Sequence, residues 1–193
     1  MAILGDEPNL FPESLLEDAD QCSEVVPAPT GRPRQWWVIY TKARQEKALA
    51  RCLFDSGIPF YLPLVPRNAI YHRHRVTSTS PLFTGYLFLC GTEEQRLVAL
   101  ATKRISQILS VDDPERLRRD LRQIQRLIAA NAPLTIESRL ASGARVRVKH
   151  GPLVGLEGTV LVRRGQTRLL VSVDFLQQGA SVEIDDFLLE PVG

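Results

Sequence analysis

The chain has 193 residues, of which 44% are hydrophobic and 24% are charged, and its formal net charge is only +2. This composition is typical of a soluble globular protein with one or two small domains. No apolar run approaches the roughly 20 residues that span a bilayer, and the acidic N-terminus does not resemble a secretory signal, so we expect a cytoplasmic protein. The three cysteines, Cys22, Cys52 and Cys90, are far apart in the sequence, which predicts reduced thiols rather than a disulfide framework or a zinc site.

The charge is unevenly distributed along the chain. Residues 1–34 carry seven acidic and two basic side chains, and their prolines and weak periodicity predict a disordered acidic tail. Residues 35–138 carry fifteen basic and nine acidic side chains, whereas residues 139–193 carry seven and six. The basic excess of the middle segment favours an anionic partner, although an ordinary solvated surface explains it equally well.

The middle segment alternates between strand and helix patterns. The aromatic and β-branched run Trp36–Thr41 predicts a strand, and Ala43–Ser56 predicts a helix that ends at Gly57. Thr92 and Gln95 have the spacing of a capping box, which predicts a second helix that extends to about residue 102. Further strands, and a protruding basic hairpin, are predicted at Phe60–Val65, Arg67–Ser80 (the hairpin), Pro81–Cys90 and Ile105–Val111.

A third helix is predicted to begin at Asp112-Asp113-Pro114, because aspartate caps helices and proline fits the first turn. One apolar stripe on this helix comprises Leu117, Leu121, Ile124 and Ile128. Residues 131–142 show no period and are predicted to be a linker. The remaining strands are predicted at Arg145–Lys149, Glu157–Val162, Arg168–Val173, Ala180–Ile184 and Leu188–Glu190. This order predicts an α+β protein, with an α/β sandwich around a mixed four-stranded sheet followed by a small five-stranded β-barrel.

Two blocks of sequence carry recognisable motifs. The first block contains WWVIYTKARQEKALARCLFDSGIPFYLPLV and, further on, PLFTGYLF; it resembles the N-terminal domain of the NusG family of bacterial transcription elongation and antitermination factors. The second block, GARVRVKHGPLVGLEGTV, resembles the KOW motif of small SH3-like barrels. The run DLRQIQRLI resembles the specialised members of the family. The resemblance implies a NusG N-terminal domain at residues 35–130, a linker at 131–142 and a KOW domain at 143–193.

The resemblance also implies a function. Such a protein binds the clamp helices of the β′ subunit of RNA polymerase, contacts non-template DNA in the transcription bubble, and suppresses pausing or termination. Its KOW domain recruits a small-subunit ribosomal protein or the termination factor Rho, and we expect a monomer without cofactor, metal ion or membrane association. The alternative is a ribosome- or RNA-binding KOW protein that does not contact polymerase. We do not expect an enzyme, because the three histidines have no visible catalytic partners and the sequence lacks a phosphate-binding loop.

The resemblance assigns polymerase contacts to Tyr86, Phe88 and Val111. Tyr86 and Phe88 also lie on one face of their predicted strand, and aromatic residues are enriched in protein interfaces. The alternative is that both rings belong to the ordinary hydrophobic core. In the KOW block, the resemblance assigns partner binding to Phe175 at the end of the strand LLVSVDF, and a buried strand-end phenylalanine is the alternative.

Basic residues of the first block are candidates for DNA binding, because long cations neutralise phosphates and arginine can stack on an unpaired base. The candidates are Lys42, Arg44, Arg73, Arg75, Lys103 and Arg104. Arg73 and Arg75 lie in the cluster Tyr71-His72-Arg73-His74-Arg75, at the tip of the predicted hairpin. Arg44 also begins a basic helical stripe with Lys47 and Arg51, which is a weaker candidate. The alternative for each of these residues is a solvated surface cation.

Overall fold

The structure is a computed structural model that describes residues 7–17, 34–71, 74–139, 143–163 and 165–192. The chain divides into two compact units, a first unit at Met1–Pro114 and a second unit at Glu115–Gly193. The described residues form three α-helices and antiparallel sheets, in agreement with the predicted α+β class. The division falls after the first residue of the third helix (Pro114–Ala129), whereas the sequence analysis placed this helix in an N-terminal domain at residues 35–130.

The first unit is built on a five-stranded sheet. Its strands, in spatial order, are β1 (Leu10–Phe11), β3 (Phe60–Tyr61), β6 (Tyr86–Gly91), β2 (Gln35–Thr41) and β7 (Ile105–Ser110). Every neighbouring pair is antiparallel, so the prediction of a mixed four-stranded sheet is wrong. The physical reason is that strands β2 and β3 run in the same direction but β6 lies between them, so they form no parallel pair.

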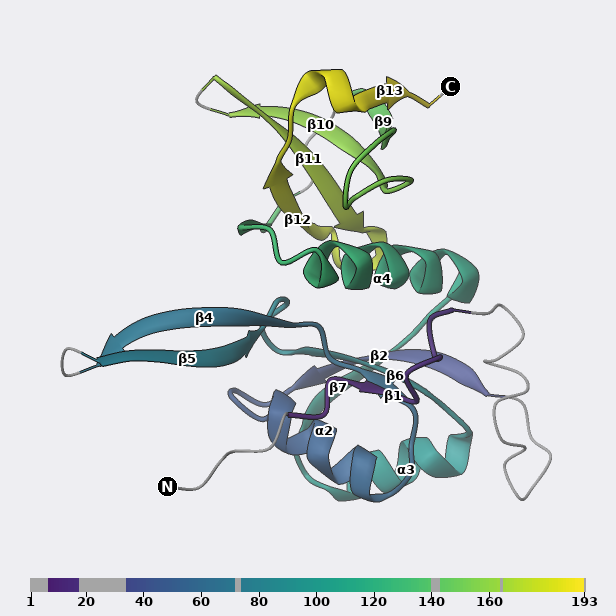
Figure 1. Ribbon diagram of the computed structural model, residues 1–193. Helices are drawn as coiled ribbons and strands as arrows, with labels where there is room; N and C mark the ends of the chain where they lie inside the picture. The colour runs from purple at the N-terminus through teal and green to yellow at the C-terminus, as the bar shows by residue number, and fades with distance from the viewer. Residues whose placement is uncertain (1–6, 18–33, 72–73, 140–142, 164, 193) are drawn as a thin grey trace. The chain divides into compact units, whose positions relative to one another are not determined.

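Two helices cover one face of this sheet, α2 (Glu46–Asp55) and α3 (Glu93–Ala101) (Figure 1). Leu49 and Leu53 of α2 are buried in one core cluster with Leu87 and Leu89 of β6, as the helical period predicts. The capping box at the start of α3 is confirmed, because the Thr92 hydroxyl accepts from the Gln95 backbone and the Gln95 side chain accepts from the Thr92 backbone. Both helices of this unit therefore follow from local sequence signals.

Residues 7–17 correct part of the prediction of disorder over residues 1–34, of which residues 1–6 and 18–33 lie outside the described residues. Leu10 and Phe11 pair with β3, and Leu15 and Leu16 are fully buried. Glu7 forms an ion pair with Arg51 of α2 at 2.8 Å. A compositional argument misses this segment because its few apolar side chains become ordered only when a distant strand offers a free edge.

Strands β4 (Leu64–Tyr71) and β5 (His74–Pro81) pair only with each other in the described sheets and form a long antiparallel hairpin. Figure 1 shows the hairpin extending away from the rest of the first unit, in agreement with the protrusion predicted over Arg67–Ser80. At its base, the Lys47 amine of α2 donates to the Thr79 hydroxyl at 3.1 Å. This contact links the hairpin to the helix that covers the sheet.

The second unit contains α4 (Pro114–Ala129) and a six-stranded antiparallel sheet. The strands, in spatial order, are β13 (Leu189–Pro191), β9 (Arg145–Val148), β10 (Glu157–Arg163), β11 (Gln166–Val173), β12 (Gln178–Glu183) and β8 (Leu134–Glu137). The five predicted strands are all present, with ends shifted by at most two residues. Strand β8 was not predicted and lies within the expected linker at 131–142, where LTIE is too short to show a period.

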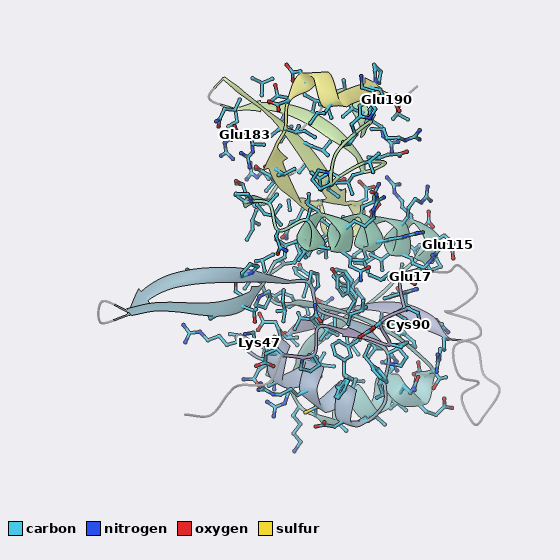
Figure 2. All side chains as sticks on the ribbon, viewed as in Figure 1. Glu17, Lys47, Cys90, Glu115, Glu183 and Glu190 are labelled. Carbon is cyan, nitrogen blue, oxygen red and sulfur yellow. The ribbon has the colours of Figure 1, made fainter. Side chains whose placement is uncertain are left out.

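The cysteines correct a second prediction. Cys90, which Figure 2 labels in the first unit, is fully buried on β6 and takes part in a disulfide, so the expectation of reduced thiols is wrong at this position. Cys52 on α2 is half-buried and free. Wide spacing in sequence does not exclude a disulfide, because the fold can bring distant cysteines together. Within the described residues, no helix is long and apolar enough to cross a bilayer.

Candidate functional site

An exposed pair of tyrosines lies where β2 and β6 run side by side. Tyr40 and Tyr86 are directly opposed across the two strands, with ring centroids 5.2 Å apart and planes tilted by 52°. Tyr40 is 42% exposed and Tyr86 is half-buried. Tyr86 was a predicted polymerase contact, whereas sequence reasoning missed Tyr40. The available signal was the alternation in WWVIYT, which places Tyr40 on the same strand face as Val38.

Phe88 lies on the same strand as Tyr86 but in a different environment. It is fully buried, and its ring stacks at 6.5 Å on the ring of Tyr61, which is buried as well. Burial raises the pKa of Tyr61 well above its ordinary value. Val111, just beyond β7, is half-buried. Of the three predicted polymerase contacts, Phe88 therefore presents no surface, and Tyr86 shares an exposed aromatic surface with Tyr40.

The backbone beneath the tyrosine pair is held by buried polar contacts at Gly85. Its amide donates to Glu46 Oε1 at 2.8 Å, and its carbonyl accepts from the Thr41 amide at 2.8 Å and the Thr41 hydroxyl at 3.3 Å. Glu46 and Thr41 are buried, so these bonds are shielded from water. They fix the turn before β6 to the end of β2 and to the start of α2, which sets the position of both tyrosines.

Gly85 also leaves room for the Tyr40 ring, and alanine is expected to disturb both features. Gly85 has φ +85°, and a Cβ atom added there would lie 2.8 Å from Tyr40 Cε2. Gly85→Ala should lower the free energy of unfolding by about 1–2 kcal/mol from backbone strain and should also displace the Tyr40 ring. Urea denaturation measures the first effect, and nuclear Overhauser contacts between the two tyrosine rings report the second.

Gly57 provides the matched control for this substitution. It has φ +62°, but nothing lies within 4 Å of the position that an alanine Cβ would occupy, so Gly57→Ala should cause backbone strain alone. If both variants lose equal stability and both keep the contacts between the tyrosine rings, Gly85 is not required for the tyrosine surface.

Four of the six predicted DNA-binding residues lie together at one end of the sheet in the first unit. They are Lys42, Arg44, Lys103 and Arg104, and we call them the cation group. The end of β2 and the start of β7 are neighbours there, and the Lys42 amide donates to the Arg104 carbonyl at 2.8 Å. Lys42 and Arg104, which are 62 positions apart in the sequence, are thus brought into adjacent loops.

Two members of the cation group have an unusual backbone conformation. Arg44 has φ 60° and Lys103 has φ 59°, both in the left-handed region, which side chains other than glycine rarely adopt. Lys42, Arg44 and Lys103 are exposed, whereas the Arg104 guanidinium donates to the Gln45 side chain. The three exposed cations are available to an external anion, and such strained positions often mark binding sites.

The other basic candidates are placed differently. Arg73 lies outside the described residues. Arg75 lies on β5, opposite Ile70, and the structure describes its backbone but not its side chain. The predicted helical stripe is wrong at Arg44, which lies before α2 and has φ 60°. Its other two members are engaged: Lys47, labelled on α2 in Figure 2, contacts Thr79, and Arg51 is paired with Glu7. The cation group is therefore more accessible to an external anion than Lys47 and Arg51 are.

Phe175 in the second unit lies on a short 3-10 turn, η1 (Asp174–Leu176), directly after β11. Its ring is 38% exposed, in agreement with the exposed aromatic that the family resemblance implies. The Asp174 amide donates to Asp120 Oδ2 of α4 at 2.9 Å, and the Asp174 carboxylate is paired with Arg116 of the same helix. Burial raises the pKa of Asp120 from its ordinary value, partly offset by the hydrogen bond from the Asp174 amide.

A pocket of about 310 Å³ in the second unit is lined by Thr135, Arg163, Gln166 and Arg168. Arg168 donates to Thr135 and Ser181, and Arg163 is paired with Glu137 at 3.2 Å. Both guanidinium groups are thus engaged with the protein itself. Among the described residues, no group of three or more histidine, cysteine or carboxylate side chains has the arrangement of a metal site.

Comparison with known proteins agrees with this geometry. A family model described as "Transcription termination factor nusG" matches residues 34–138, which is more than half of the 193 residues. The matched region contains the tyrosine pair, Gly85 and the complete cation group. A search of curated proteins gave no match. The family match, over a region whose strands and helices follow the motifs quoted above, shows that this chain belongs to the NusG family.

Proposed function

We propose that this protein is a transcription elongation or antitermination factor that binds RNA polymerase through its first unit. The observation that carries the proposal is the partly exposed Tyr40–Tyr86 pair, which lies within the NusG match and next to buried hydrogen bonds at Gly85. A rigid, partly exposed aromatic pair suits a protein interface, because aromatic residues bury a large area at a low cost in conformational entropy.

The partner surface in this proposal is the pair of clamp helices of the polymerase β′ subunit. Tyr40 and Tyr86 contact the clamp helices directly, with Val111 at the margin of the contact. Phe88, buried next to Tyr86 on the same strand face, supports the surface without touching the partner. The binding therefore depends on two aromatic side chains from neighbouring strands, β2 and β6.

A tagged copy of the full chain tests this proposal by recovery of its partners from a cell lysate. Recovery of core RNA polymerase, lost in a Tyr40→Ala/Tyr86→Ala double variant, supports it. Recovery of ribosomes without polymerase would instead favour the alternative of a ribosome- or RNA-binding protein. Single-round transcription with purified polymerase then shows whether the bound factor decreases or increases pausing and termination.

The cation group is proposed to contact the non-template DNA strand. Residues 35–114 of the first unit carry ten basic and six acidic side chains, and three members of the group are exposed at one end of the sheet. Contacts of this kind act mainly through phosphates, because lysine neutralises a phosphate without reading the base. The proposed role is to retain the protein on an elongation complex after polymerase has been bound.

Replacing Lys42 and Lys103 with alanine should weaken binding to an elongation complex but not to DNA-free core polymerase. Each lost phosphate contact should lower the slope of log affinity against log salt by about 0.7 for a single strand. Fluorescence anisotropy across a salt series measures both the affinity and the slope. Lys149→Ala, which removes an exposed lysine of the second unit, is the control. An equal loss of affinity on both complexes would assign the two lysines to the protein interface.

The second unit is proposed to recruit a second protein through Phe175, as a KOW domain does in the family. The support is the exposed ring on η1 and the KOW-like sequence of β9 and β10 with the loop between them. The proposed partner is a small-subunit ribosomal protein or Rho. The proposal includes a cytoplasmic, monomeric protein without enzymatic activity or cofactor.

A further inference from the structure

The turn that carries Phe175 is held through every polar group of Asp174. The Asp174 amide donates to Asp120 Oδ2 at 2.9 Å, and its carboxylate is paired with Arg116. Its carbonyl accepts from the Gln177 amide at 3.1 Å and from Gln177 Nε2 at 2.7 Å. Because Phe175 is the next residue, the contacts of Asp174 set the position of the backbone from which its ring extends.

Helix α4 supplies two of these contacts from one face. Arg116 and Asp120 are four residues apart, so their side chains lie on the same side of the helix. The same face reaches the β9–β10 region, where Gln123 Oε1 accepts from the Glu157 amide at 3.4 Å and Arg126 donates to the Val154 carbonyl. The helix thus contacts the rest of the second unit at three separate places, one of which is the Phe175 turn.

We infer that Asp120 is a positioning residue for partner binding at Phe175. This inference rests on the proposed function, in which Phe175 contacts a partner protein. The carboxylate of Asp120 holds the first amide of η1, so the turn keeps one conformation and the exposed ring is ordered before the partner arrives. A preordered aromatic side chain binds more tightly, because less conformational entropy is lost on association.

The test depends on separating the hydrogen bond of Asp120 from its charge. Asparagine keeps an oxygen acceptor at the same place, whereas alanine removes it. The pKa of Asp120 is raised in the folded protein, so ionisation of its carboxyl at neutral pH disfavours folding and loss of that charge is not expected to destabilise the unit. Asp120→Asn should therefore behave as the wild type and Asp120→Ala should not.

The experiment uses the full chain in five forms: wild type, Asp120→Asn, Asp120→Ala, Phe175→Ala and the control Arg122→Ala, which changes an exposed residue of α4. Amide hydrogen exchange at Asp174 reports whether the turn is held. Titration with purified Rho and, separately, with small ribosomal subunits reports partner affinity. In Asp120→Ala, exchange at Asp174 should accelerate roughly three- to tenfold and partner affinity should fall by a similar factor, as expected for one lost hydrogen bond. Asp120→Asn and Arg122→Ala should stay within about twofold of the wild type in both measurements.

The outcomes separate this inference from the proposed function. If Phe175→Ala weakens binding but Asp120→Ala changes neither exchange nor affinity, the positioning role is wrong and the proposed function remains. If Asp120→Asn loses as much affinity as Asp120→Ala, the charge rather than the hydrogen bond matters, and the inference is overturned. If Phe175→Ala binds normally, or if neither probe binds the wild type, the proposed partner contact fails, and exchange at Asp174 alone decides whether Asp120 holds the turn.

Discussion

Replacing Phe88 with alanine is expected to lower the free energy of unfolding of the first unit by about 3–5 kcal/mol, the usual cost of truncating a buried phenylalanine. Phe88 is fully buried in the middle of β6, between Val38 of β2 and Tyr61 of β3, and its ring stacks on Tyr61. Alanine would leave a cavity between three strands that cannot collapse without moving the sheet. Urea denaturation followed by circular dichroism measures the loss.

Tyr86→Ala is the control on the same strand face. Tyr86 is only half-buried, so its truncation should cost clearly less stability than Phe88→Ala. The opposite result is equally informative. A Phe88→Ala protein that keeps its stability but no longer binds polymerase would show that Phe88 contacts the partner, as the family resemblance first implied.

Tyr86→Ala and Tyr40→Ala are each expected to weaken binding to core RNA polymerase by roughly thirtyfold. Truncation of an aromatic hot spot typically costs about 2 kcal/mol or more, and 1.4 kcal/mol corresponds to a factor of ten. The two rings contact each other, so the double variant should lose less than the product of the two single losses. Titration of labelled core polymerase with the purified variants measures each affinity.

Phe54→Ala is the matched control for the loss of an exposed aromatic side chain. Phe54 is 48% exposed on α2, where its ring packs edge-on against Phe11. Its truncation should leave the polymerase affinity unchanged, because α2 covers the sheet face opposite the tyrosine pair. If all three variants lose the same affinity, the effect is not specific to the tyrosine surface, and the proposed clamp-helix contact must be abandoned.

The tyrosine surface shows what the strand pattern left undecided. Tyr86 and Phe88 are two residues apart on a strand, so their side chains point to the same face. The strand pattern alone therefore predicts the same role for both, either partner surface or core. The structure separates them because Phe88 has a strand on each side, β2 and β3. Strand β3 ends at Tyr61, opposite Phe88, so Tyr86 has a neighbouring strand on the β2 side only. Tyr40 becomes part of the surface only through its pairing with Tyr86, which a single sequence does not reveal.

The cation group shows a similar limit. Charge counting located the basic excess in residues 35–138, and the family resemblance selected individual lysines and arginines. Neither approach showed that the loops after β2 and before β7 are joined by the Lys42–Arg104 backbone hydrogen bond. The same holds for Lys47 and Arg51, whose contacts with Thr79 and Glu7 come from distant segments.

The sequence by itself determined the elements whose signals are local. The capping box at Thr92, the helix end at Gly57 and the alternation of Val146 and Val148 with exposed arginines all appear in the structure as predicted. These signals work because the interacting groups are at most four residues apart, so the chain has little freedom to satisfy them in another way.

Only the tertiary structure decided features that depend on distant partners. Residues 10 and 11 become β1 because β3 offers an edge, residues 134–137 become β8 because β12 does, and Cys90 is oxidised despite its wide spacing from the other cysteines. Distant partners also decide three further features. These are the antiparallel pairing of the sheet, the exposure of Tyr40, and the hydrogen bond from the Asp174 amide to Asp120 in the Phe175 turn. Their free energy comes from burial and hydrogen bonds between segments far apart in sequence, and no pattern within either segment encodes it.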